Sequence, residues 1–564
     1  MLFNPKKASF DHLDERSKEI MQKTIEFFET KGKKKLKEDD HNRVWYDDFL
    51  QFVKKEGIFS ALLTPDQHGG EGCRWDTFRN MDFNEILGFY SLAYWYTWQV
   101  TILGLGPIWM GKNEAVKKKT ARLLKEGGIF AFGLSEKEHG ADLYASDMAI
   151  TPMGDGQYRA DGGKYYIGNG NEAALVSTFA KDSETDEYAF FVVDTKHENY
   201  ECVQNLVNSQ MYVSEYALHG YPLTDDDILT TGSEAWDSAL NTINVGKYNL
   251  GWASIGICTH AFYEAIDHAA GRFLFKHYVT DFPHIRQLFV DGYTRLCAMR
   301  MFAARAADYI RSASADDRRY LLYNPMVKMK VTTQGEEVIN LLWDVIAARG
   351  FEKDTYFEMA ARDIRALPKL EGTVHVNMAL IIKFMANYFF NPGEFPEIGK
   401  IDAPVHDEFL FNQGPTKGLG RIQFHDFNIA YDSLDLPNIG IFKEQIALLL
   451  EFLATATPDK KQAKDIDFLL NLGELFTLVA YGQLLIEKAG LDAVEDDLMD
   501  QIFDFMVRDF SKFALQLYSK TSSTDKQMEI CKKMIKKPEV NPDRFNRIWE
   551  THVYALKGAY CMNE

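Results

Sequence analysis

Cysteine is scarce in this chain and is not spaced for cross-linking or metal binding. The 564 residues hold six cysteines, and no two of them form a C-x-x-C pair. The pattern indicates neither a zinc site nor a disulfide framework. Reduced thiols in a cytosolic protein are the simplest explanation, so we expect a cytoplasmic location. The fourteen histidines also lack ligand spacing, and no metal site is expected.

Signals for export and membrane crossing are missing as well. The first residues, MLFNPKKASFDHLDER, contain no apolar core and soon turn acidic, so we expect no signal peptide. No run of about 18 apolar residues predicts a transmembrane segment. Lys and Arg number 63 against 82 Asp and Glu, which gives a net charge of −19. Such a surface opposes general binding to nucleic acid or to anionic membranes.

Several common catalytic motifs are absent. No G-x-G-x-x-G follows a predicted strand, and neither H-E-x-x-H nor G-x-S-x-G occurs. The stretch from Gly106 comes near a P-loop, but it ends Gly111-Lys112-Asn113 without the hydroxyl that would hold magnesium. The absences argue against a Rossmann domain, a zinc protease and an α/β-hydrolase.

The chain does contain enough apolar side chains for large cores. Hydrophobic residues make up 46% and aromatic residues 13%. A prior of about one domain per 150 residues predicts three or four domains. The local patterns predict a mostly α protein with a central β domain. We expect an N-terminal helical domain at 1–125, a β domain at 126–234, a helical bundle at 235–392 and an appended helical domain at 400–564.

Short β-prone segments and turn signals fill the second region. The segments are residues 129–134, 148–151, 157–160, 164–167, 176–180 and 189–193. Turns are expected between them, for example at Asp161-Gly162-Gly163. This spacing predicts an antiparallel β-sandwich or barrel.

Longer helical segments follow the β region. Those at 239–275, 282–313, 325–348 and 373–390 predict a four-helix bundle. Further helices are expected at 442–454, 464–488, 491–518 and 544–558. In the N-terminal region, the aromatic-rich residues 81–110 predict a buried core helix.

One carboxylate stands just before the last helix of the predicted bundle. Thr373 is the expected N-cap of that helix, two residues after Glu371. Pro368 disfavours a helical Leu367, so we expect a bent loop to deliver Glu371 to the helix start. Taken alone, Glu371 is better explained by the helix dipole, worth about 0.3–1 kcal/mol. Carboxylates at helix starts are common.

Several segments in order resemble the acyl-CoA dehydrogenase family across about residues 40–392. Glu371-Gly372-Thr373, preceded by Arg362-Asp363, is similar to the family's catalytic E-G-T loop. The stretch 129–142, with Ser135-Glu136-Lys137 and His139-Gly140-Ala141-Asp142, resembles its T-E-P and A-G-S-D segments. Residues 164–170 are similar to K-x-W-I-T-N-G, and 271–275 to G-R-x-x-F. An extra C-terminal helical domain is a feature of long-chain members.

The resemblance implies a flavin-dependent reaction. This is the α,β-dehydrogenation of an acyl-CoA thioester to the trans-2-enoyl-CoA, as in fatty acid β-oxidation. Glu371 would take the α-proton while hydride passes to FAD N5. The implied partners are the acyl-CoA substrate and an electron-transfer flavoprotein, and the implied assembly is a homodimer or homotetramer.

The resemblance also assigns residues to the two ligands. The implied FAD-binding residues are Phe132, Leu134, Ser135, Tyr166, Gly168, Arg272, Phe275, Gly350 and Thr373. The implied substrate-binding residues are Gly140, Ala141, Lys247 and Gly372. In the family, the arginine at the place of Arg272 reaches the flavin diphosphate across a subunit boundary.

Some positions depart from the family pattern. Gly168 replaces a threonine whose hydroxyl usually reaches flavin N5, which leaves only the main-chain amide. The carboxylate of Asp344 would repel the flavin diphosphate, so a displaced adenosine site is conceivable. The other departures are Ala141, Lys276, Pro283, Ala347 and Ala348.

Three alternatives stay open from the sequence. An acyl-CoA oxidase would share the chemistry and return electrons to oxygen. A non-catalytic, DNA-binding flavoprotein is disfavoured by the acidic charge and by the presence of Glu371. A scaffold with a decayed flavin pocket is suggested by Gly168 and Asp344.

Overall fold

The computed structural model describes residues 2–564, which form two compact units. The β unit comprises residues 7–249, 402–417 and 562–564, and the bundle unit comprises 2–6, 250–401 and 418–561. The long helix α7 (Gly232–Gly271) contributes its first part to the β unit and its second part to the bundle unit. The four-domain division expected from the sequence stays a prediction.

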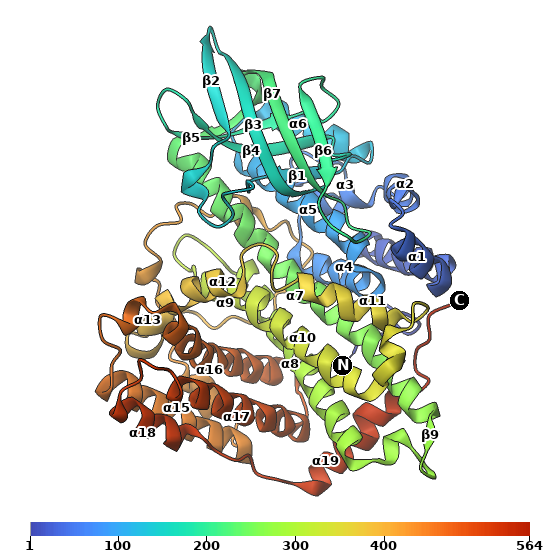
Figure 1. The fold of residues 1–564 in the computed structure, drawn as a ribbon, viewed down its shortest axis with the longest axis vertical. Helices are drawn as coiled ribbons and strands as arrows, with labels where there is room; N and C mark the ends of the chain where they lie inside the picture. The colour runs from blue at the N-terminus through green and yellow to red at the C-terminus, as the bar shows by residue number, and fades with distance from the viewer. Residues whose placement is uncertain (1) are drawn as a thin grey trace. The chain divides into compact units, whose positions relative to one another are not determined.

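Six helices open the β unit (Figure 1). They are α1 (Glu15–Asn42), α2 (Asp47–Lys55), α3 (Ile58–Leu63), α4 (Thr77–Tyr90), α5 (Leu92–Met110) and α6 (Glu114–Lys125). Ser91 separates α4 from α5 because its extended backbone ends α4 while its hydroxyl accepts the N–H of Ala93. The aromatic segment predicted as one core helix is therefore two helices. Both are almost wholly buried.

An eight-stranded sheet follows these helices. Its strands are β1 (Phe130–Gly133), β2 (Ala149–Gly154), β3 (Gln157–Gly168), β4 (Leu175–Asp182), β5 (Tyr188–Val193), β6 (Tyr200–Asn205), β7 (Val213–Thr224) and β8 (Ile228–Thr231). Seven strands follow the order β6-β7-β3-β2-β4-β5-β8, and β1 pairs with β4. The pairs β1–β4 and β2–β4 are parallel and the others are antiparallel. The sheet is therefore mixed, whereas the sequence led us to expect antiparallel pairing throughout.

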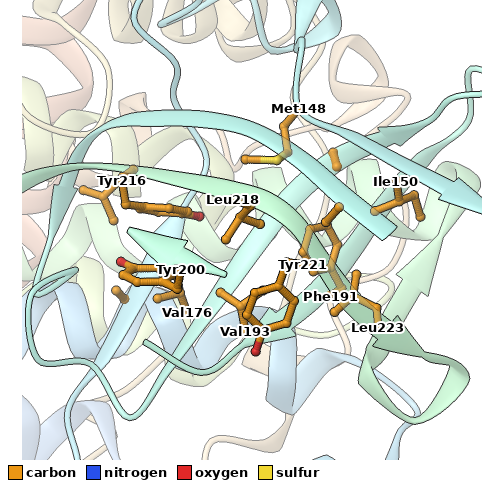
Figure 2. Packing of buried hydrophobic residues seen from close by; sticks show 14 of the residues in the cluster. Met148, Ile150, Val176, Phe191, Val193, Tyr200, Tyr216, Leu218, Tyr221 and Leu223 are labelled. Carbon is orange, nitrogen blue, oxygen red and sulfur yellow. The ribbon is translucent and has the colours of Figure 1, made fainter. Parts of the chain in front are cut away.

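The core of this sheet is built from aromatic and branched side chains. Figure 2 shows the rings of Tyr200, Tyr216 and Tyr221 close to Val176 and Leu218. The buried hydroxyls of Tyr216 and Thr178 lie 2.8 Å apart, so this polar pair is satisfied inside the core.

The turn expected at Asp161-Gly162-Gly163 does not exist. Strand β3 continues through these residues, and its register with β7 shifts between Ala160 and Gly162. Gly162 has φ +136°, a conformation that side chains disfavour. Between Ala160 and Gly162, Asp161 alone faces two β7 residues, His219 and Gly220, so the irregularity is a β-bulge in β7 and not a chain reversal in β3.

The bundle unit begins with the second part of α7. A short hairpin follows, made of β9 (Phe273–Leu274) and β10 (His277–Tyr278), and leads to α8 (Pro283–Arg311). The next helices are α9 (Tyr320–Met326), α10 (Thr332–Ile346), α11 (Tyr356–Asp363), α12 (Val374–Ile381) and α13 (Met385–Phe390). A π-helical turn, Val327–Val331, joins α9 to α10, and a 3-10 turn, Ile382–Phe384, joins α12 to α13. The single helix expected at 373–390 is thus two helices and a tighter turn.

The C-terminal helices of the same unit are α14 (Asn428–Asp432), α15 (Pro437–Thr455), α16 (Ile466–Asp492), α17 (Asp496–Tyr518), α18 (Asp525–Met534) and α19 (Pro542–Ile548). Helix α17 packs on α8 through buried charges. Arg295 makes two bonds to Asp509, at 2.7 and 2.8 Å. Among the described helices, α16 alone is long and apolar enough to cross a membrane, which is weak evidence. Because 83% of its most apolar window is buried in the protein, α16 has the environment of a core helix.

Candidate active site

Two loops, one in each unit, carry the predicted base and several of the other expected site residues. The first, Leu134–Met148, follows β1 in the β unit and is called the β1 loop. The second, Pro368–Gly372, precedes α12 in the bundle unit and is called the Glu371 loop. Each is described by itself.

A buried ion pair holds the β1 loop. Lys164, on β3, places its Nζ 2.6 Å from Glu136 Oε1 and also donates to the carbonyl of Leu134 at 3.0 Å. Glu136 accepts further bonds from the Ser146 hydroxyl at 2.5 Å and the Asp147 N–H at 2.7 Å. One carboxylate therefore closes a loop of about ten residues on a strand.

Burial and charge oppose each other in this pair. Burial alone would raise the pKa of Glu136, but Lys164 and the hydrogen bonds outweigh it and lower that pKa below its ordinary value. Burial lowers the pKa of Lys164 to about 8 against the attraction of Glu136. The opposite charge and the hydrogen bonds therefore favour the ionised carboxylate of Glu136.

Ser135 and Tyr166 are brought close to each other by this arrangement. The Ser135 hydroxyl donates to the carbonyl of Tyr165 at 2.7 Å, and the Tyr165 N–H donates to the carbonyl of Ser135 at 2.9 Å. Tyr166 follows directly, with φ +64° and its side chain 64% exposed. Phe132 is buried on β1, and Leu134 is half-buried at the start of the loop. A flat aromatic ring and a hydroxyl thus stand at one end of the sheet.

Steric crowding explains why position 168 is a glycine. A Cβ built on Gly168 would lie 2.7 Å from a ring carbon of Tyr96 and 2.8 Å from its hydroxyl oxygen. Tyr96 belongs to α5, so a helix fills the space that a threonine side chain would need. Apart from the run of aromatic residues on α5, no sequence pattern pointed to this pair.

The implied substrate-binding residues of the β unit lie apart in the chain. Gly140 and Ala141 are exposed at the tip of the β1 loop. Beside them, His139 Nδ1 lies 3.1 Å from Asp142, and this hydrogen bond raises the pKa of His139. Lys247 is buried on α7, next to Gly246, whose carbonyl accepts a bond from Gln99 at 3.0 Å.

The Glu371 loop has a backbone that few residues adopt. Glu371 has φ +52° and Gly372 has φ +86°, so two consecutive residues are left-handed. One oxygen of the half-buried Glu371 carboxylate is shielded from solvent. Thr373 caps α12 as predicted, with its hydroxyl 3.5 Å from the Val376 N–H. Leu367 lies outside the helices, in the turn that follows Ala366, although its φ of −57° and ψ of −44° are helical angles and its N–H bonds to Ile364.

Two residues that the sequence analysis missed hold this loop. Lys328 donates from Nζ to the carbonyl of Pro368 at 2.7 Å and to the carbonyl of Gly372. Asn377 donates to the carbonyls of Gly372 and Thr373, both at 3.0 Å. Both side chains are fully buried. A signal for Lys328 existed, since a lysine inside the apolar run Met326-Val327-Lys328-Met329 must find acceptors.

The other implied cofactor residues of the bundle unit lie elsewhere. Phe275 is 86% exposed at the tip of the β9–β10 hairpin, and Arg272 is exposed just before it. In Figure 1 the hairpin lies far from α12 within the unit, so these two residues are not beside Glu371. Phe275 and Lys276 have φ +53° and +67°, the two positive angles of a type I′ turn. Lys276 therefore keeps a conformation suited to glycine.

The segment after α10 also keeps glycine-like geometry. Ala347 has φ +54° and ψ −133°, a combination that a Cβ makes costly. Gly350 is buried, and a Cβ there would lie 2.8 Å from Trp343 Nε1. Asp344 is exposed. The turn shape is thus present although the chain lacks the paired glycines that the resemblance implies.

Comparison with known proteins agrees with this fold. A family model described as "Acyl-CoA dehydrogenase, C-terminal domain" matches residues 234–386. The chain is 24% identical over 378 residues to the very long-chain specific acyl-CoA dehydrogenase of Rattus norvegicus, covering 63% of this chain and 55% of that protein. The chain is thus similar to acyl-CoA dehydrogenases, and residues 234–386 match the C-terminal domain of that family. It spans about half the length of the very long-chain relatives that it matches.

A reductase subunit and a solved structure are also similar to this chain. The caffeyl-CoA reductase-Etf complex subunit CarC of Acetobacterium woodii is 22% identical over 61% of this chain and 91% of its own length. A crystal structure of an acyl-CoA dehydrogenase complexed with FAD from Bacillus anthracis has a TM-score of 0.74 at 16% identity. It covers 99% of this chain and 97% of that chain, so the C-terminal helices are part of a known version of the fold.

The residues of the β unit fit an isoalloxazine ring. An exposed aromatic ring at Tyr166 can lie against a flat heterocycle, and main-chain groups with the half-buried Ser135 can meet its polar edge. A Cβ at Gly168 would lie 2.8 Å from the Tyr96 hydroxyl oxygen, so this hydroxyl is one polar group beside the main chain at that end of β3.

Proposed function

We propose that this protein is a FAD-dependent acyl-CoA dehydrogenase with Glu371 as the base for the α-proton. The supporting observation is the conformation of Glu371. Its left-handed backbone and its loop, closed by Lys328 and Asn377, hold a carboxylate at the start of α12. A strained residue held by buried contacts is typical of an active-site group.

The proposed reaction divides its work between the two loops. Glu371 would remove the proton from the α-carbon of the thioester as a general base. Bound FAD would supply the hydride acceptor for the β-carbon. In the β unit, Phe132, Leu134, Ser135, Tyr166 and Gly168 would hold the flavin ring. The resemblance also assigns Thr373 and Gly350 of the bundle unit to FAD. Gly140, Ala141, Lys247 and Gly372 would contact the acyl-CoA.

A second copy of the chain enters the proposal through Arg272 and Phe275. Both side chains are exposed and lie far from α12 within their own unit. An arginine can bind phosphate oxygens in a bidentate way. We therefore propose a homo-oligomer in which Arg272 reaches the flavin diphosphate of the partner. Electrons would leave to an electron-transfer flavoprotein, as the name of the Acetobacterium relative suggests.

The decisive test is anaerobic titration of the purified protein with acyl-CoAs of graded chain length. Flavin absorbance should bleach with the wild type. Glu371→Gln should keep its flavin content and slow the bleaching by about 10²–10⁴-fold, the usual contribution of a general base. Glu352→Gln, an exposed acid in the same unit, is the matched control. Bleaching of Glu371→Gln at the wild-type rate would sink the assignment.

The reductase relative favours a second candidate. Running in reverse, the same site would reduce an enoyl-CoA, with protonated Glu371 returning the α-proton. Adding enoyl-CoA to the chemically reduced protein would measure that direction. Stoichiometric peroxide during turnover in air would instead indicate an acyl-CoA oxidase.

A further inference from the structure

Two carbonyl oxygens of the Glu371 loop converge on one ammonium group. Pro368 and Gly372 stand at the two ends of the loop, four residues apart, and Lys328 Nζ bonds to both carbonyls. The Lys328 side chain is fully buried. A cation in such a place is costly unless it is hydrogen-bonded, so the carbonyls and the lysine stabilise each other.

The helical segment that carries Lys328 is irregular at this position. Lys328 lies in the π-helical turn between α9 and α10, three residues after Pro325, which cannot donate a main-chain bond. The Thr332 hydroxyl donates to the carbonyl of Lys328 at 2.5 Å and so satisfies an acceptor in the turn. On the adjoining helix α7, a Cβ at Gly251 would overlap the side chain of Val327. π-turns of this kind are frequent at functional sites.

The loop needs such a contact because its own backbone does not favour the observed shape. Glu371 and Gly372 are both left-handed, and non-glycine residues in that region carry a conformational cost. A loop closed only by its own short-range bonds would be free to relax around residue 371. Lys328 prevents this by joining the first and last residues of the loop.

From this geometry we infer that Lys328 is the positioning residue that holds Glu371 in its reactive conformation. The inference rests on the proposed function, since it assigns Lys328 a role only through Glu371. Lys328 touches the loop and acts on the reaction through the placement of the carboxylate.

The test compares Lys328→Met with Lys328→Arg, which keeps the charge, and with Lys369→Met. Lys369 is exposed on the same loop and lies 3.2 Å from the half-buried Glu336, so it is a matched control. Two quantities are measured on the full chain with its flavin. One is amide hydrogen exchange of residues 366–373 without substrate, and the other is the pre-steady-state rate of flavin reduction by acyl-CoA across pH.

Lys328→Met should speed exchange of the loop amides by about 10- to 100-fold, the factor for losing a hydrogen bond to a charged group. Flavin reduction should slow by at least a similar factor with unchanged flavin content and acyl-CoA affinity. Lys328→Arg should recover part of both losses, and Lys369→Met should match the wild type. If Lys328→Met does not fold, Lys328→Gln, which keeps one donor, takes its place.

Equal reduction rates for Lys328→Met and Lys369→Met would overturn this inference and leave the proposed function standing. The inference would also fail if the loop loosens while the reduction rate stays at the wild-type value. A wild type whose flavin is not reduced by any acyl-CoA would instead overturn the proposed function, and this inference with it.

Discussion

The two loops of the candidate site are both held by a fully buried lysine, but with different partners. Lys164 pairs with a carboxylate, Glu136, which in turn collects two main-chain N–H groups and a hydroxyl. Lys328 bonds to two main-chain carbonyls. The contact of Lys164 depends on a carboxylate that titrates, Glu136, whereas the two carbonyls bonded to Lys328 do not titrate.

The difference matters because buried charges respond to pH and to the loss of a partner. Glu136 has a lowered pKa, so its folded-state contribution is present above its ordinary value of 4.5 and is lost as the pH falls through the lowered value. Carbonyl acceptors do not titrate in this range. The β1 loop should therefore loosen in acid before the Lys328–carbonyl contacts are affected.

The largest effect is expected for Glu136→Gln. Removing the carboxylate leaves Lys164 buried without its charge partner, which should lower the free energy of unfolding by about 3–5 kcal/mol. Urea unfolding followed by tyrosine and tryptophan fluorescence measures this. The double variant Glu136→Leu/Lys164→Met should lose much less, because no lone charge is left.

The control for this prediction is an exposed pair in the same unit. Lys196 and Glu172 lie 3.0 Å apart on the surface. Lys196→Met should change the free energy of unfolding by about 0–1 kcal/mol. If Glu136→Gln were as mild as Lys196→Met, the contrast drawn between the two loops would be wrong.

A smaller effect is expected for Asn377→Ala in the Glu371 loop. The variant loses two neutral hydrogen bonds to Gly372 and Thr373, worth about 1–2 kcal/mol together. Asn387→Ala is its match, because Asn387 also donates to two carbonyls, at 2.7 and 3.0 Å, but outside the loop. Hydrogen exchange at residues 368–373 should rise in Asn377→Ala and stay unchanged in Asn387→Ala.

The smallest effect concerns His139 at the tip of the β1 loop. Its hydrogen bond to Asp142 raises its pKa above 6.5, so the protonated form is favoured in the folded chain. The contact is fully present below pH 6.5 and is lost as the pH rises through the raised pKa. Histidine NMR titration, with His139→Gln to assign the signal, measures it. Asp142→Asn should bring the pKa back down; no change would show that Asp142 is not the cause.

Local patterns predicted those parts of the fold that local chemistry decides. Thr373 could be placed as an N-cap because a hydroxyl at a helix start bonds its own helix. Strand β6 was missed because five of its six residues are exposed, so no alternation marks it. The glycines at 162 and 163 were taken for a turn, but strand β3 continues through them opposite a β-bulge in β7.

The candidate site was predictable only in part for a similar reason. The E-G-T loop and the segments around Ser135 and Tyr166 are continuous in the sequence. The contacts that shape them are not: Lys328 lies 40 residues or more before the carbonyls that it holds. Tyr96 and Gly168 likewise come from a helix and a strand far apart in the chain. Such tertiary contacts carry no local signature.

Helix α12, which begins just after the Glu371 loop, rests on the C-terminal helices. A Cβ at Gly473 on α16 would overlap the Met378 side chain of α12, and the Tyr388 hydroxyl of α13 bonds to Gln483 on α16 at 2.5 Å. Residues beyond 400 therefore support the helix that follows the proposed base. A chain truncated near residue 400 would expose the apolar face with which α12 packs on α16. The C-terminal part therefore cannot be exchanged or removed as an independent module.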